Sequence, residues 1–374
     1  MTELYTTSRL RAHARCARYH HLRYDLGLAD APGPSAAFGT AGHMALESWY
    51  RMRAADLPGA ALAEALEALE AVEASGLDPY DRAKLRVLIQ GYDARWGDEM
   101  DSYDVLGVEE EFRYELDGRQ IGGKVDARVR RRADGAVFVV EHKFTGSAIG
   151  DGESYWDRLA IDTQVSIYID GAEQIAGEPI AGVIYDVIGR PPHRPHAATP
   201  EGERKLTQGK GCKVCGGKVG KAGSGVLRLA QGGVVSADHA ITVVSRPCST
   251  CRGTGWEDAP RLYANQRASD ETPEEFELRL ADMIGESPEA WFRRGVIVRL
   301  DDELPTMRLD LLDRVRLIEL GKTIGAAPRN PDACNAYGST CPFFAACAGR
   351  ASIDDEIQFP RRGAHPELSQ QQTT

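Results

Sequence analysis

The 374-residue sequence has no apolar run long enough to cross a membrane, and its N-terminus lacks the apolar segment of a secretory signal. We therefore expect a soluble, cytoplasmic protein rather than a membrane-spanning or secreted one. Basic residues are fewer than acidic ones: the sequence has 45 Lys and Arg residues and 56 Asp and Glu residues, which gives a formal net charge of -11. This balance argues against a general nucleic-acid coat protein, although basic residues gather locally near Arg15 and Arg128.

Large apolar residues are scarce between residues 191 and 261, where Pro and Gly are frequent. Such a segment would not fold well without a cross-link. It contains two CxxC pairs, Cys212/Cys215 and Cys248/Cys251, and glycines follow each pair. Four thiols at this spacing are typical of a tetrahedral zinc site, so the segment is predicted to be an inserted, zinc-ribbon-like module.

Outside that segment, hydrophobic periodicity predicts a compact α/β core with a mixed central sheet flanked by helices. Helices are expected over 38–52, 60–74, 81–100, 156–171, 272–283 and 304–324, and strands over 105–112, 120–130, 136–143, 180–188 and 291–300. The expected domains are a core (1–190), the inserted module (191–261), a C-terminal helical part (262–349) and a polar tail (350–374).

One predicted strand ends in charged residues, which a buried strand does not do without a reason. Residues 137–140 are apolar β-formers and lead into Glu141, His142 and Lys143. Residues i and i+2 share a face, so Glu141 and Lys143 point the same way, and strand pairing brings Asp126 to the same end of the sheet. Two carboxylates and a lysine suit Mg²⁺ or Mn²⁺ and a phosphate. An ordinary hairpin with a salt bridge at the sheet edge is the alternative.

Four short motifs follow one another along the chain. They are Gly42-His43 with Leu46-Glu47, Gly122-Gly123-Lys124-Val125-Asp126, Glu141-His142-Lys143, and Gln164 with Tyr168. In this order the sequence resembles the PD-(D/E)XK nuclease superfamily, specifically its RecB-like and CRISPR-associated iron-sulfur exonuclease branch. The resemblance covers about residues 8 to 190, and the C-terminal cysteines extend it to about residue 349. It implies a restriction-endonuclease-like core.

The resemblance also implies a role for each motif residue. The implied ligands of the divalent ion are His43, Asp126, Glu141 and the backbone carbonyl of His142. Lys143 would orient or activate the attacking water, and Gln164 with Tyr168 would position the scissile strand or the lysine. The alternative for Gln164 and Tyr168 is that they only pack on a helix face. The alternative for His43 is that it is an ordinary core histidine.

Four further cysteines lie near the two chain ends, and disulfides are disfavoured for them in an intracellular protein. They are Cys16, Cys334, Cys341 and Cys347. The resemblance implies that they hold a [4Fe-4S] cluster, four thiolates being its usual complement. Cys334 and Cys341 are separated by six residues, a wider spacing than the family's, which leaves zinc as an alternative occupant or Cys334 as a spectator. Arg15 and Arg18 flank Cys16, and with Arg128 they are the candidate DNA-binding arginines.

The function that follows is a metal-dependent DNA nuclease, an exonuclease on single-stranded or frayed ends, working in recombination, repair, phage DNA metabolism or spacer acquisition. Its expected partners are DNA and recombination or CRISPR-type proteins, in a bacterial or phage-infected cell. The alternatives are a non-catalytic DNA-binding or assembly subunit that keeps the fold, and an endonuclease or RNA-directed nuclease. For the zinc module there are two hypotheses. The metal either closes the loop as a purely structural element, or the module binds DNA or a partner protein.

Overall fold

A computed structural model of the protein describes residues 3–29, 34–71, 77–150, 152–231, 242–300, 302–336, 339–365 and 368. By its internal contacts the chain divides into two compact units, Met1–His193 with Phe276–Thr374, and Arg194–Glu275. The first unit holds the large sheet and its helices, and the second holds both CxxC pairs.

The first unit is built on a six-stranded mixed sheet with the order β1-β3-β4-β5-β10, and β2 pairs with β3. The strands are β1 (Leu4–Tyr5), β2 (Tyr103–Leu116), β3 (Arg119–Arg131), β4 (Val137–Thr145), β5 (Ile180–Gly189) and β10 (Phe292–Ile297). The β1–β3 and β4–β5 pairs are parallel, whereas β2–β3, β3–β4 and β5–β10 are antiparallel. The α/β class with a mixed central sheet, predicted from the sequence, is confirmed.

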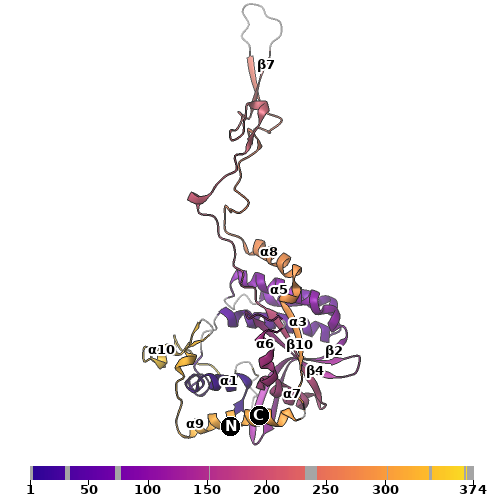
Figure 1. The fold of residues 1–374 in the computed structure, drawn as a ribbon, viewed down its shortest axis with the longest axis vertical. Helices are drawn as coiled ribbons and strands as arrows, with labels where there is room; N and C mark the ends of the chain where they lie inside the picture. Colours follow the sequence, from indigo (N-terminus) through magenta and orange to yellow (C-terminus); the bar gives the residue numbers. More distant parts are fainter. Residues whose placement is uncertain are drawn as a thin grey trace, which may run out of the picture. The chain divides into compact units, whose positions relative to one another are not determined.

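Helices cover both faces of this sheet (Figure 1). Val140 of β4 lies in a core shared with α3, α4, α5 and α8, and Val139 lies in a second core shared with α1, α7 and α9. Neighbouring residues of a strand point to opposite faces, which explains why β4 is apolar throughout this stretch. The helices are α1 (Thr7–Arg15), α2 (Ala17–His20), α3 (Pro34–Ala54), α4 (Ala61–Ala71), α5 (Pro79–Met100), α6 (Ser154–Asp157), α7 (Thr163–Ala176), α8 (Pro273–Glu286), α9 (Glu303–Thr323) and α10 (Phe344–Cys347).

The helix predicted over 156–171 is wrong at its start. Asp162 is extended, and its carboxylate accepts a hydrogen bond from the backbone N–H of Gln164 at 2.9 Å, which caps α7. The residues before it form only the short α6 and a 3₁₀ turn over Arg158–Ile161. The cap gives Gln164 a defined place at the beginning of α7.

The second unit has little apolar core of its own. Its strands are β6 (Lys210–Gly211), β7 (Val226–Gln231), β8 (Thr242–Pro247) and β9 (Trp256–Asp258), paired as β6–β9 and β7–β8. The buried cluster of this unit consists of the cysteines, with Leu227 packed against them. A core this small needs a cross-link to be stable.

The two ends of the chain meet within the first unit. A π-helix over His21–Asp25 follows α2, and Leu28 forms a β-bridge with Arg361. Leu22, Phe343 and Phe359 are buried together. The C-terminal segment also contains the short strands β11 (Asn335–Ala336) and β12 (Ser339–Thr340), and of the predicted polar tail, residues 366, 367 and 369–374 lie outside the described part. In the described ranges, no helix is both long and apolar enough to cross a membrane.

Candidate active site

Pairing between β3 and β4 stops directly before the charged residues of both strands, although β3 stays paired with β2 and β4 with β5 beyond this point. Its last paired residues are Ala127 and Val140. One position further, Oδ2 of Asp126 accepts a hydrogen bond from the backbone N–H of His142 at 2.8 Å. The Asp126 carboxylate is therefore tied to β4 at the point where β3 and β4 separate.

Two histidines flank this carboxylate. Nδ1 of His43 lies 3.4 Å from Oδ2 of Asp126, and Nδ1 of His142 lies 3.2 Å from the same oxygen. The candidate ligand atoms of these three residues all lie within 4.8 Å of one another, as one metal ion requires. Burial opposes ionisation of Asp126, but the two imidazoles outweigh burial and hold the pKa of this carboxyl well below its usual range.

His43 reaches the sheet because α3 approaches β4 closely. A Cβ at Gly42 would lie 2.4 Å from the nearest ring atom of Phe144, so the glycine lets this ring lie against the helix. The rings of His43 and Phe144 then meet with centroids 5.9 Å apart. This close approach of α3 to β4 places His43 beside Asp126.

Glu141 and Lys143 form the second half of the site. Lys143 Nζ donates a hydrogen bond to Oε1 of Glu141, and Gln164 Nε2 donates to the same oxygen at 2.9 Å. Gln164 also lies 2.6 Å from the hydroxyl of Tyr168, one turn along α7. Burial alone would lower the pKa of Lys143, but attraction to Glu141 and Asp126 raises it, so the lysine stays charged.

The residues fit a hard divalent cation. Oε2 of Glu141 is buried and has no hydrogen-bond partner in the described part of the chain. Burial raises the pKa of the Glu141 carboxyl, attraction to Lys143 opposes the rise, and repulsion from Asp126 adds to it. The ligand atoms that lie within 4.8 Å of one another are those of His43, Asp126 and His142, and Glu141 is outside this group, although its carboxyl feels the charge of Asp126 and His43. A buried, unpartnered carboxylate oxygen next to such a group is a donor that Mg²⁺ or Mn²⁺ would satisfy.

A family model described as the PD-(D/E)XK nuclease superfamily matches residues 5–348. The chain belongs to this superfamily. Its members are mostly metal-dependent nucleases, so membership implies a divalent metal and a nucleic-acid substrate, on a restriction-endonuclease-like fold. A search of curated proteins found no match.

Behind the site, this PD-(D/E)XK protein has a buried polar network that the sequence reasoning missed. The hydroxyl of Tyr92 donates to Asp186 at 2.6 Å and lies 3.3 Å from Nε2 of His142. Asp186 is fully buried and receives two hydrogen bonds from Arg294, at 2.5 and 2.7 Å. The signal was present, because Asp186 is a lone charge in the otherwise apolar strand β5.

Of the three arginines expected to bind DNA, Arg128 and Arg15 have side-chain partners within the protein. Arg128 donates two hydrogen bonds to Glu110, each at 3.0 Å. Arg15 donates to the carbonyl of Ala333 at 3.2 Å and lies over the ring of Tyr19. Arg18 has a side-chain Nε that is buried without a partner among the described residues. Binding of DNA by these arginines stays a prediction.

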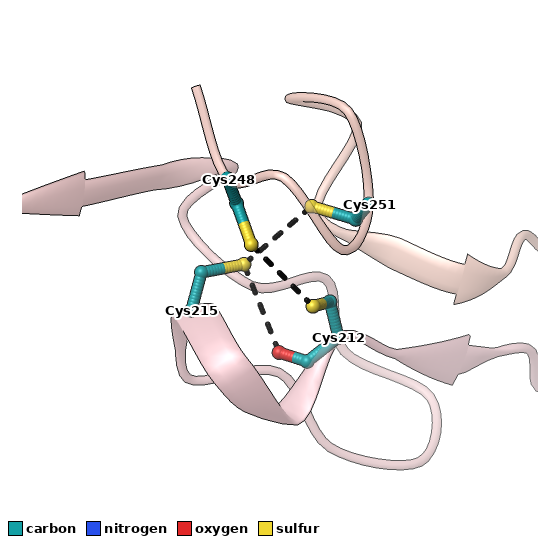
Figure 2. Close-up of side chains that lie close together, drawn as sticks. All are labelled: Cys212, Cys215, Cys248 and Cys251. Carbon is teal, nitrogen blue, oxygen red and sulfur yellow. Dashed lines mark hydrogen bonds between the residues drawn. The ribbon is translucent and has the colours of Figure 1, made fainter. Parts of the chain in front are cut away.

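In the second unit, the two CxxC pairs bring their thiols together (Figure 2). The Cys212–Cys248 and Cys215–Cys251 sulfur pairs are each 3.8 Å apart, and all four sulfurs lie within 4.8 Å of one another. With zinc–sulfur bonds of about 2.3 Å, a tetrahedral site places its sulfurs about 3.8 Å apart. The geometry is therefore that of a four-cysteine metal site.

The other cysteines of this superfamily member line one cavity of about 200 Å³ in the first unit. Cys16 enters it between α1 and α2, and Cys334, Cys341 and Cys347 enter from the C-terminal segment. Within the described ranges, no three of these sulfurs lie within 4.8 Å of one another. These four cysteines thus connect the N-terminal and C-terminal segments, and their sulfur atoms lie further apart than those of the two CxxC pairs.

Proposed function

We propose that the protein is a divalent-metal-dependent nuclease that hydrolyses DNA from single-stranded or frayed ends. The observation that carries this proposal is the buried, unpartnered oxygen of Glu141, which lies in one charged site with Asp126, His43 and Lys143. The DNA substrate and the end preference rest on the resemblance to the iron-sulfur exonuclease branch.

In this mechanism the carboxylates of Asp126 and Glu141, with His43, hold the cation. When bound, the cation activates water and neutralises charge on the phosphate. The network through Tyr92 and His142 keeps the Asp126 carboxylate ionised and oriented. The backbone carbonyl of His142 as a further ligand stays a prediction.

Lys143 serves the reacting atoms, whereas Gln164 orients the Glu141 carboxylate. The Lys143 ammonium, kept charged by Glu141, orients the attacking water and stabilises negative charge on the phosphate. Gln164 holds the Glu141 carboxylate by its amide N–H, and Tyr168 holds the amide in turn. These bonds leave Oε2 of Glu141 for the cation.

The test uses 5′-labelled and 3′-labelled single-stranded DNA with Mn²⁺ or Mg²⁺. We expect shortening from an end, and we expect Asp126→Ala and Lys143→Ala to lose about 10²-fold or more of the rate. Circular single-stranded DNA should resist hydrolysis because it lacks an end. RNA of the same sequence should resist hydrolysis because it carries 2′-hydroxyls. Full activity of Asp126→Ala would overturn the proposal. Hydrolysis of circular DNA or of RNA would contradict only the proposed substrate, single-stranded DNA with an end.

We further propose a [4Fe-4S] cluster for the cavity lined by Cys16. A single zinc ion would draw all four sulfurs to about 3.8 Å from one another, whereas the wider spacing of this set suits a larger cluster. Protein purified without oxygen should be brown and contain iron and sulfide. Colourless protein with two zinc ions and no iron would contradict the cluster.

For the second unit we propose one structural zinc and a surface that contacts nucleic-acid phosphates. Basic side chains in residues 204–256 are Arg204, Lys205, Lys210, Lys213, Lys218, Lys221, Arg228, Arg246 and Arg252, and the only acidic residue in this stretch is Asp238. Lys218 and Lys221 are exposed and have no ion-pair partner within the described residues. Their joint replacement by glutamine should weaken DNA binding and flatten its salt dependence, because each phosphate contact adds about 0.7 to the slope for single strands. An unchanged slope would leave the module a purely structural role.

A further inference from the structure

A cleft opens beside Lys143, on the side of the site that faces α7 and α9. It has a volume of about 460 Å³, within the range of small-ligand pockets. Polar residues from separate elements line it, among them Arg11, Lys143, Arg158, Gln164, Tyr185 and Arg314. Lys143 and Gln164 thus belong both to the catalytic site and to the wall of this cleft.

Two positive charges in the cleft are uncompensated. Arg11 donates two hydrogen bonds to Asp162, at 2.6 and 2.8 Å, and Lys143 pairs with Glu141. Arg158 and Arg314, by contrast, are exposed and have no carboxylate partner in the described ranges. The wall next to the catalytic lysine therefore attracts an anion.

A buried hydroxyl in the same wall also lacks a partner. Tyr185 is 1% exposed, and among the described residues its hydroxyl makes no hydrogen bond. The side-chain oxygen of Gln164 is buried and unpartnered too. Buried polar atoms are rarely left in this state unless a ligand or water completes them.

The rim that carries Arg158 is held rigidly. Arg299 donates hydrogen bonds to the carbonyls of Leu159 and Asp162, both at 3.0 Å, and a third to Ser166 at 3.2 Å. The guanidinium of Arg158 itself lies 4.4 Å from the centroid of the Tyr155 ring. The cleft is thus preorganised, which lowers the cost of ordering a bound strand.

We propose that this cleft binds the phosphate next to the scissile phosphate in a nucleic-acid strand. Arg158 and Arg314 supply the charge, and the Tyr185 hydroxyl donates a hydrogen bond to the bound nucleotide. The proposal rests on the proposed nuclease function, because Lys143 places the bond being cut at the edge of the cleft. A strand phosphate is favoured over a free anion because the cleft is continuous with the catalytic site.

The first test compares two substrates that differ in the flanking phosphate. For a single-stranded oligonucleotide, Arg158→Gln with Arg314→Gln should raise KM about tenfold or more and leave kcat nearly unchanged. For thymidine 5′-(p-nitrophenyl phosphate), which has one phosphodiester only, the double variant should match the wild type. The control is Arg316→Gln, on the same helix, whose side chain is engaged by Asp313 and Asp117 instead. Equal losses on both substrates would overturn the proposal.

The second test removes the charge from the substrate instead. An oligonucleotide with one methylphosphonate beside the scissile bond should bind wild-type protein about tenfold more weakly than the normal oligonucleotide. The double variant should bind the two equally, since its partner for that charge is gone. Tyr185→Phe should weaken binding of both oligonucleotides. Discrimination that persists in the double variant would overturn the proposal.

Binding by fluorescence anisotropy, with Ca²⁺ in place of Mn²⁺, separates this proposal from the proposed function. If the protein binds DNA with the expected discrimination but hydrolyses nothing, the nuclease function fails and the phosphate site stands. If the protein hydrolyses DNA but binds the normal and the methylphosphonate oligonucleotides equally, the phosphate site fails and the nuclease function stands.

Discussion

At the scale of single residues, Gln164 decides how the Glu141 carboxylate is presented. The amide of Gln164 donates to Oε1 of Glu141 at 2.9 Å, and Lys143 donates to the same oxygen. Both donors therefore act on one oxygen and leave the other, Oε2, without a partner among the described residues. A residue that orients a ligand in this way changes metal affinity more than it changes the chemical step.

We expect Gln164→Ala to raise the Mn²⁺ concentration for half-maximal activity by about 10–100-fold, with much of kcat recovered at saturating metal. Titration of the initial rate with Mn²⁺ measures this, and calorimetric Mn²⁺ binding gives a readout independent of catalysis. Tyr168→Phe keeps the Gln164–Glu141 bond and should have a smaller effect. A normal Mn²⁺ requirement in Gln164→Ala would show that the amide does not position Glu141.

His20 makes stability depend on pH. It is 3% exposed, and Nε of Arg9 donates to its ring at 3.1 Å. Burial, together with the charge of Arg9, lowers the pKa of His20 to about 4. Between that value and about 6.5 the unfolded chain binds a proton that the native protein does not. The free energy of unfolding should therefore fall as the pH drops through this window.

The measurement is urea unfolding at pH 6.5 and pH 5 for the wild type and for His20→Gln, which keeps an acceptor for Arg9. The wild type should lose about 2 kcal/mol more than the variant over this interval, because the variant lacks the His20 ring that is protonated on unfolding. Equal losses would mean that His20 is protonated in the native protein.

At the scale of elements, the contact between α3 and β4 sets the geometry of the site. At Gly42 the helix lies against the ring of Phe144, where an added Cβ would lie 2.4 Å from the nearest ring atom. His43 is the next residue along the helix, so displacement of α3 at this point moves His43 away from Asp126. One small residue in a helix thereby controls a contact between two distant parts of the chain.

Gly42→Ala should lower stability by about 1–3 kcal/mol and also lower nuclease activity, because the ring of Phe144 must move. Gly39→Ala is the matched control, since nothing lies within 4 Å of its added Cβ. That variant should gain up to about 1 kcal/mol from helix propensity and keep its activity. Urea unfolding and the Mn²⁺-dependent rate measure both effects. A stabilised, active Gly42→Ala would show that Phe144 does not constrain the helix.

At the scale of the whole molecule, the cysteine-lined cavity ties together segments that are more than 300 residues apart. Cys16 lies between α1 and α2, and Cys347 ends α10. The hydrophobic contacts around Leu22, Phe343 and Phe359 support the same closure. Because α1 also packs in the core with α7 and α9, this closure supports the wall of the catalytic cleft.

Cys16→Ser and Cys347→Ser should both lose iron and visible absorbance, and both should lower the melting temperature by about 5–10 °C. Each removes one of the four ligands of the same site, so similar effects are expected from opposite ends of the chain. Cys248→Ser should instead lose zinc and keep its colour. Metal analysis, absorbance and thermal unfolding distinguish the two classes. If the Cys16→Ser protein is still brown, Cys16 is not a ligand of the cluster.

The sequence by itself determined the fold class and the chemistry available to the protein. The apolar run into Glu141 and Lys143, and the spacing of the CxxC pairs, are local patterns that depend on strand periodicity and on metal-ligand spacing. Only the tertiary structure decided which side chains meet. The Tyr92–Asp186–Arg294 network and the cleft with Arg158 and Arg314 join residues far apart in the chain. Such contacts follow from how helices pack on the sheet, which local periodicity does not specify.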